Sequence, residues 1–155
     1  MKLTKFSRQI DHNSHEPKKL SLLSKAIYYI LNFTWGLPMT LIGGLVALVL
    51  TIAGKKPRKR TSGIAFRTGS CNWGGFSLGP VVVTDTMPTE GLVNHELGHS
   101  CQNAVYGPFM IVISIASCVR YWFREWFPYR VKTDYDDIWF EGQATRWGNW
   151  LAERW

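Results

Sequence analysis

Residues 85–108 read DTMPTEGLVNHELGHSCQNAVYGP, and they predict one helix that carries a candidate metal site. Pro88 suits a first helical turn, and Gly107 followed by proline is a stop signal. The candidate N-terminal caps are Asp85, Thr86 and Thr89. The predicted helix therefore runs from about Pro88 to Tyr106, with the HExxH motif near its middle.

His95 and His99 are four residues apart, so both imidazoles lie on one face of this helix and can reach one Zn²⁺ ion. Glu96 is not needed as a ligand. Beside the first histidine it can act as general base toward a water bound at an open zinc position. Gly98, which weakens a helix, indicates that something approaches the backbone closely there.

A catalytic zinc site needs a third protein ligand. His12 and His15 precede the apolar segment of residues 26–54, which we expect to cross a membrane, so they would lie on the other side of that membrane from the motif helix. Carboxylates then remain as candidates for the third ligand. Glu141 in DDIWFEGQATRWG is the strongest candidate, because it shares a predicted helix face with Thr145, and Asp137, one turn earlier, is the reserve candidate. A solvated Glu141 without a ligand role is the alternative.

Residues 26–54 contain no charged side chain and are long enough as a helix to cross a hydrocarbon core of about 30 Å. We expect one transmembrane anchor here, because Pro38 and the glycines Gly36, Gly43 and Gly44 are better tolerated in lipid than in water. A buried core helix is the alternative. The polar leader of residues 1–25 is too long for a cleaved signal peptide.

The net charge of +7 is concentrated after the apolar segment, where five of the 18 basic residues fall between Lys55 and Arg60. A cluster in this place is typical of the positive-inside rule and of contact with anionic headgroups, so we expect a lipid bilayer as a partner and no nucleic acid. It also predicts that the catalytic part is cytoplasmic, in a single- or multi-pass membrane protein. The three cysteines have no zinc-ribbon or disulfide spacing, which fits a reducing compartment.

Residues 64–84 contain glycine-punctuated runs of β-forming residues, which predict two strands joined by a turn near residues 72–75. Pro80 cannot donate to a ladder, so the second strand is expected at an edge or bulged there. An extended peptide could pair with this strand around Phe76 to Val83.

The apolar run at residues 107–119 is too short to span a membrane alone, and it fits a core helix, a re-entrant segment or half of a membrane-dipping hairpin. Six of the eight tryptophans follow, between Trp122 and Trp155. They fit the membrane interface and an aromatic core equally well. A last helix is expected from about Asp134 to Trp155.

The segments HELGHSCQ, YGPFMIVISIAS and WFEGQATRWG resemble gluzincin-type zinc metallopeptidases, in particular small bacterial membrane proteins with an HExGHxxQ motif. The resemblance covers roughly Gly75 to Gly148. It implies His95, His99 and Glu141 as zinc ligands and Glu96 as general base. Gluzincins often carry Asp four residues after the ligand Glu, whereas this chain has Thr145.

The expected fold is α+β: a transmembrane helix, then a small zincin-like domain with a β-hairpin, the HExxH helix and a C-terminal ligand helix. The expected division is leader 1–25, anchor 26–54, basic linker 55–63 and metallopeptidase domain 64–155. The favoured function is a membrane-anchored, zinc-dependent peptidase acting on a peptide or protein substrate. A non-catalytic membrane protein with structural zinc is the alternative, and an accidental motif is the third.

Overall fold

The computed structural model describes residues 17–69, 71, 73–127, 130 and 137–155, so His12 and His15 of the leader lie outside the described residues. Its elements are, in chain order, α1 (Leu22–Phe33), α2 (Leu37–Ile52), β1 (Arg58–Lys59), β2 (Ile64–Arg67), β3 (Gly75–Leu78), β4 (Val81–Thr84), α3 (Glu90–Tyr106), the 3₁₀ turn η1 (Gly107–Phe109), α4 (Met110–Trp126) and α5 (Trp139–Arg154). The fold is therefore mixed α+β, as expected.

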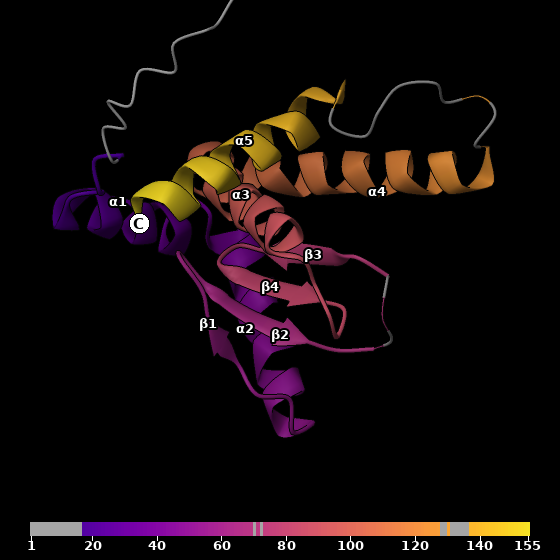
Figure 1. Ribbon diagram of the computed structural model, residues 1–155, viewed down its shortest axis with the longest axis horizontal. Helices are drawn as coiled ribbons and strands as arrows, with labels where there is room; N and C mark the ends of the chain where they lie inside the picture. The colour runs from indigo at the N-terminus through magenta and orange to yellow at the C-terminus, as the bar shows by residue number, and fades with distance from the viewer. Residues whose placement is uncertain (1–16, 70, 72, 128–129, 131–136) are drawn as a thin grey trace, which may run out of the picture.

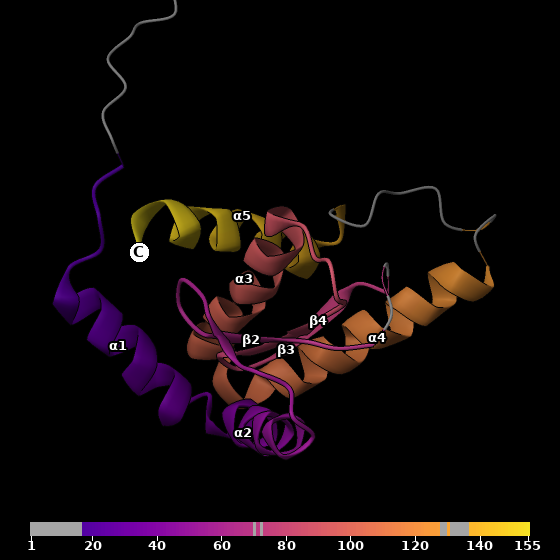
Figure 2. The same cartoon turned by 60° about the horizontal axis from the view of Figure 1, so that its bottom comes forward.

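The sheet is small and mixed, with the strand order β1-β2-β4-β3. β4 is buried at every position, which requires cover on both faces of the sheet. Figures 1 and 2 show the two covers, with α3 on one side of the sheet and α2 on the other. On the α3 side, Ala65 and Val82 of the sheet pack against Val93 and Leu97 of the helix.

The predicted strand pairing is wrong in one respect, because the hairpin is formed by β3 and β4 rather than by β2 and the following strand. β2 instead pairs with β4 in parallel. Gly79, at φ +57°, and Pro80 form the hairpin turn, so the proline that was expected in a strand needs no ladder partner. β3 is an edge strand as expected, but residues 81–84 are central. The predicted linker also contributes β1, which pairs with β2.

Residues 26–54 do not form the single straight anchor that their composition predicts. α1 and α2 meet at an angle of 85°, with Pro38 in the first turn of α2. The bend is held by hydrogen bonds to α3: Asn103 Nδ2 lies 2.8 Å from Asn32 Oδ1 and 3.1 Å from the Gly36 carbonyl oxygen. Buried polar groups need such partners, and these would be lost if the two helices straightened into lipid.

α1 also packs directly against the helical core. Tyr28 is buried with Ala104 of α3 and Leu151 of α5, and its hydroxyl lies 2.5 Å from Ser100 Oγ. By length and hydropathy alone, the continuous stretch Glu90–Trp126 is the described segment that suffices for a membrane crossing, and the bent pair α1 and α2 would be a second if counted as one span.

The motif helix begins close to its predicted start, and Thr89 is the cap, with its side chain accepting from the Leu92 N–H. The last helix begins later than predicted, at Trp139, and Asp137 precedes it. Asp134 and Asp136 lie outside the described residues.

α3 and α5 cross in very close contact because both carry glycine at the crossing. A Cβ atom at Gly98 would lie 1.8 Å from the Ala144 carbonyl oxygen, and one at Gly148 would lie 1.7 Å from the Asn94 carbonyl oxygen. In both cases the added atom would meet backbone atoms of the other helix, so no side-chain rotation can relieve the clash. The sequence signal at Gly98 is thus explained by the approach of α5.

We expect Gly98→Ala to lower the free energy of unfolding by about 3 kcal/mol, because the added methyl group must push α5 away from α3. Gly44→Ala is the matched control, since it adds the same methyl group to a helix where nothing lies within 4 Å. There, relief of glycine's backbone entropy should raise stability by about 0.5–1 kcal/mol. Thermal and denaturant unfolding in one detergent measure both, and equal stabilities would contradict the close crossing.

Candidate metal centre

α3 presents His95 and His99 side by side, as their spacing predicts. The ring centroids are 4.8 Å apart and the two side chains are largely buried, with 15% and 12% of their surface exposed. Their Nε2 atoms point toward α5. One helix turn therefore supplies two nitrogen ligands directed at one point.

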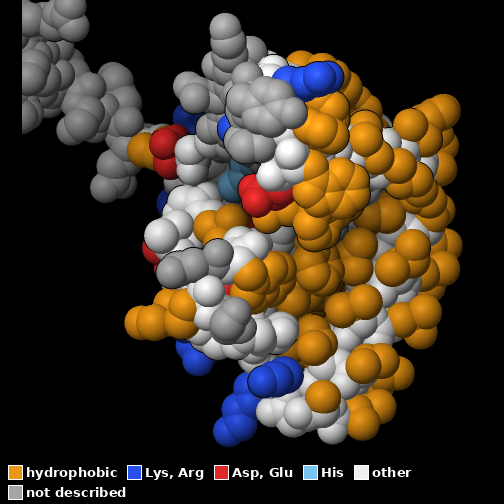
Figure 3. Space-filling view, turned by 90° about the vertical axis from the view of Figure 1, so that its right-hand side faces the viewer, with side chains coloured by type: hydrophobic (Ala, Val, Ile, Leu, Met, Phe, Trp, Pro, Cys, Tyr) orange, Lys and Arg blue, Asp and Glu red, His pale blue; other side chains and the backbone are white. Residues whose placement is uncertain are grey.

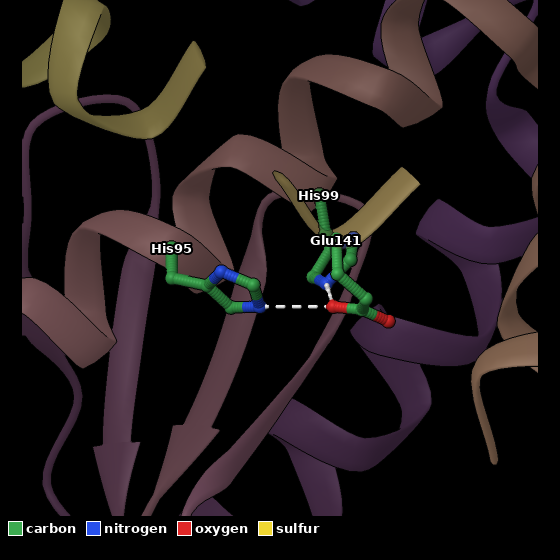
Figure 4. A group of neighbouring side chains, drawn as sticks. All are labelled: His95, His99 and Glu141. Carbon is green, nitrogen blue, oxygen red and sulfur yellow. Dashed lines mark ion pairs between the residues drawn. The ribbon is translucent and has the colours of Figure 1, made fainter. Parts of the chain in front are cut away.

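Glu141 of α5 completes the group and is fully buried. Its Oε2 atom lies 3.2 Å from His95 Nε2 and 3.2 Å from His99 Nε2 (Figure 4). His95, His99 and Glu141 form the described group of side chains that could hold a metal ion, with ligand atoms within 4.8 Å of one another. Asp137, the reserve candidate, is not part of it.

The donor geometry fits a metal ion better than direct hydrogen bonding. Glu141 Oε2 is buried and makes no hydrogen bond among the described residues, although two ring nitrogens are near. Two ligands about 2.0–2.1 Å from one tetrahedral ion lie about 3.3–3.4 Å apart, close to the observed contacts. Two imidazoles and one carboxylate are also a ligand set of catalytic zinc, which leaves a fourth position open.

The far nitrogen of each histidine has a partner that orients the ring. His99 Nδ1 lies 2.8 Å from Gln102 Oε1, and the Gln102 amide nitrogen donates to the Phe140 carbonyl oxygen at 2.6 Å, which fixes the amide. Because Oε1 only accepts, Nδ1 carries the proton and the Nε2 lone pair is free for a metal.

His95 Nδ1 lies 2.8 Å from Thr145 Oγ1. Thr145 is the residue that departs from the gluzincin pattern, in which Asp often follows the ligand Glu by four residues. Its hydroxyl occupies the orienting position, with a neutral group in place of a carboxylate.

Ser117 is a contact of this centre that the sequence did not reveal. It comes from α4, and its hydroxyl donates to Glu141 Oε1, the oxygen that faces away from the histidines. Burial raises the pKa of the Glu141 carboxyl, but the two imidazoles and the Ser117 hydroxyl outweigh it and hold the pKa below its usual value.

Glu96 lies beside the ligands and is 4% exposed. Its Oε1 atom is near Gly75 of β3, where an added Cβ atom would lie 3.3 Å away. Its Oε2 atom makes no hydrogen bond within the described part of the chain. The carboxylate thus has an oxygen available at the junction of the motif helix and the edge strand.

A cleft of about 880 Å³ opens in front of these residues. His95, Glu96 and His99 line it from α3, β3 forms one wall, and α4 forms the other. Cys118 lines the α4 wall and is exposed. The centre therefore opens onto a space large enough for several residues of a peptide.

We expect Glu141→Ala to lower zinc affinity by more than about 100-fold, because it removes a direct ligand, while Asp137→Ala changes it by less than about tenfold. Competition with a chromogenic chelator measures both, with thermal unfolding as the control for folding. The opposite ranking would show that the third ligand is Asp137.

Thr145→Val should lower zinc affinity by about 10- to 100-fold, because the His95 ring loses the hydroxyl that orients it. Thr145→Ser keeps the hydroxyl and is the matched control, with an expected affinity close to that of the unchanged protein. Equal losses in the two variants would instead indicate a packing role for the threonine methyl group.

No protein-family model matches the chain, and neither the curated proteins nor the solved structures contain a match to it. The likeness to gluzincins therefore rests on the motif residues themselves.

Proposed function

We propose that the protein is a zinc-dependent peptidase that acts at a membrane. The observation that carries this proposal is the pairing of a three-member ligand group with Glu96, a buried carboxylate that is not part of the group. A structural zinc site would be expected to be closed by a fourth protein ligand. Among the described side chains the group has three members, and this supports an open, catalytic position.

A zinc ion in this group would supply a Lewis acid that polarises a carbonyl oxygen and lowers the pKa of a bound water. Glu96 would accept a proton from that water at its Oε2 atom and pass it to the amine that leaves when the peptide bond breaks. Gln102 would keep the His99 ring in the required tautomer and orientation, and Thr145 would orient the His95 ring. Ser117 holds the ligand carboxylate of Glu141 from behind.

The edge strand β3 supports a polypeptide as the substrate. β3 pairs with β4 on one side, and residues 73–77 line the cleft on the other. An extended peptide that pairs with this edge would be fixed through its main chain, next to Glu96. On this basis we propose a zincin-like arrangement in which strand, motif helix and ligand helix surround the cleft.

The alternative function is an assembly or regulatory partner whose zinc only joins α3 to α5. The fully buried Glu141 at the helix crossing favours it to some extent, since a bound ion would also strengthen that contact. Glu96 distinguishes the two functions, because a catalytic site needs a general base beside the metal and a purely structural site does not.

We expect Glu96→Gln to retain zinc and the thermal unfolding temperature but to lose peptide cleavage, because the amide has the shape of the acid and cannot accept the proton. Glu90→Gln is the matched control, an exposed glutamate on the same helix that pairs with Arg60 at the surface. It should retain full activity. Cleavage of a peptide library by the three proteins is the assay, and equal turnover by Glu96→Gln would rule out this mechanism.

A further inference from the structure

α4 carries two different faces along its length. The face toward the cleft includes Ser114, Ser117, Cys118 and Tyr121. The opposite face is an apolar stripe whose members are each more than half exposed, namely Val112, Ile115, Val119 and Trp126, and Trp122 lies at the border between the two faces. Because these side chains remain largely exposed in the described structure, a stripe of this size in water would be unfavourable.

α2 has an apolar face of the same kind. Its inner side packs on the sheet, where Gly43 lets the Leu78 carbonyl oxygen approach. Its outer side consists of exposed aliphatic residues at helical spacing: Leu37, Leu41, Ile42, Leu45, Leu48, Val49 and Ile52. Together, these exposed residues of α2 and the apolar stripe of α4 are called the outer face.

The outer face is continuous on one side of the molecule. Figure 2 shows α2 and the first part of α4 on the lower side of the fold, with α5 on the upper side. In Figure 3 hydrophobic side chains cover one half of the view, Lys and Arg lie at the margin, and histidine is visible in a hollow beside the apolar area.

The charge distribution around this face identifies its partner. From residue 17 to residue 84 the chain has nine Lys and Arg residues and no Asp or Glu. Five of them, between Lys55 and Arg60, directly follow the end of α2. An apolar surface beside basic side chains is complementary to a bilayer with anionic headgroups, because acyl chains meet the aliphatic residues and phosphates meet the cations.

The dimensions favour insertion into one leaflet. α2 has 16 residues, about 24 Å in length, and its inner side is occupied by the sheet. In α4, the uncharged part from Met110 to Val119 is about 15 Å long, which is half the thickness of the hydrocarbon core. Arg120 follows it directly. α3 does not continue this apolar length as a span, because its Gln102 and Asn103 are buried in polar contacts.

The mouth of the cleft is framed by aromatic residues that belong to the surface as well. Trp73 and Phe76 on the β3 side and Tyr121 and Trp122 on the α4 side all line the cleft and are all at least one-third exposed. Tryptophan and tyrosine prefer the headgroup level, where the ring is apolar and the tip is wet. The mouth therefore lies beside the outer face, at the depth that these residues favour.

We infer that the outer face of α2 and α4 lies in one leaflet of an anionic bilayer, which places the cleft mouth at the headgroup level and makes polypeptide segments held at the membrane surface the substrate class. The inference of a bilayer contact depends only on the exposed residues of the outer face and the charges beside it. The substrate class rests on the proposed peptidase function.

The bilayer contact is tested by depth-dependent quenching, which needs no enzymatic activity. In the full chain, with its three cysteines replaced by serine or alanine, a fluorescent label is attached at Val119→Cys on the outer face, at Phe76→Cys at the mouth, or at Trp150→Cys on α5. Zinc content is measured for each protein as the control for folding. The vesicles contain phosphatidylcholine with phosphatidylserine and carry a quencher in the acyl chain or at the headgroup.

We expect the acyl-chain quencher to reduce the signal at position 119 by about twofold or more, the headgroup quencher to act most at position 76, and neither to act at position 150. Lack of quenching at position 119 would overturn the inference. A dimer in solution whose interface shields position 119 from the lipid would overturn it as well, because a second copy would then cover this face.

The substrate class is tested with two probes that share one scissile sequence, a free peptide and a peptide joined to an apolar helix in the same vesicles. The unchanged protein should cleave the anchored probe about tenfold faster, because the membrane concentrates both partners. Ile115→Glu with Val119→Glu should reduce the ratio of the two rates to about one, while Trp150→Glu should keep the tenfold ratio. Equal rates on the two probes would overturn the substrate class. Cleavage of neither probe would refute the peptidase proposal and the substrate class with it, and the quenching result would still decide the bilayer contact.

Discussion

The close crossing of α3 and α5 is the contact on which the candidate metal centre depends. Gly98 and Gly148 allow the two backbones to meet, and Ala144 between them adds no bulk. Only at this separation can Glu141, a short side chain on one helix, place an oxygen 3.2 Å from both histidine nitrogens of the other. The carboxylate is buried by the same contact, so helix packing and ligand geometry are one constraint rather than two.

The sequence predicted much of this centre because its parts are local. The histidine spacing, the Thr89 cap and the face shared by Glu141 and Thr145 all follow from helical periodicity within one segment. Gly98 was readable as a point of close approach, although the partner helix was not. The Gln102 contact with His99 is also within one helix turn, so it follows from the same local spacing.

The parts that the sequence did not predict depend on contacts between distant segments. β2 pairs with β4 rather than with β3, and no local pattern distinguishes a parallel neighbour from a hairpin neighbour. The bend between α1 and α2 depends on Asn103, 71 positions after Asn32, so the hydropathy of residues 26–54 indicated a straight span. Ser117 contacts Glu141 only because the fold brings α4 next to the start of α5, and composition cannot show this contact.

α4 links the metal centre to the outer surface. Its Ser117 hydroxyl holds the Glu141 carboxylate, while Val112, Ile115 and Val119 on the opposite side are each more than half exposed. A helix with few packing contacts has low local stability, so its position is sensitive to its surroundings. Whatever covers the apolar stripe also stabilises the position of Ser117, and with it the orientation of the Glu141 carboxylate. Under the inference above, the bilayer would therefore support the metal site as well as deliver the substrate, and in water the same helix would hold Glu141 less firmly.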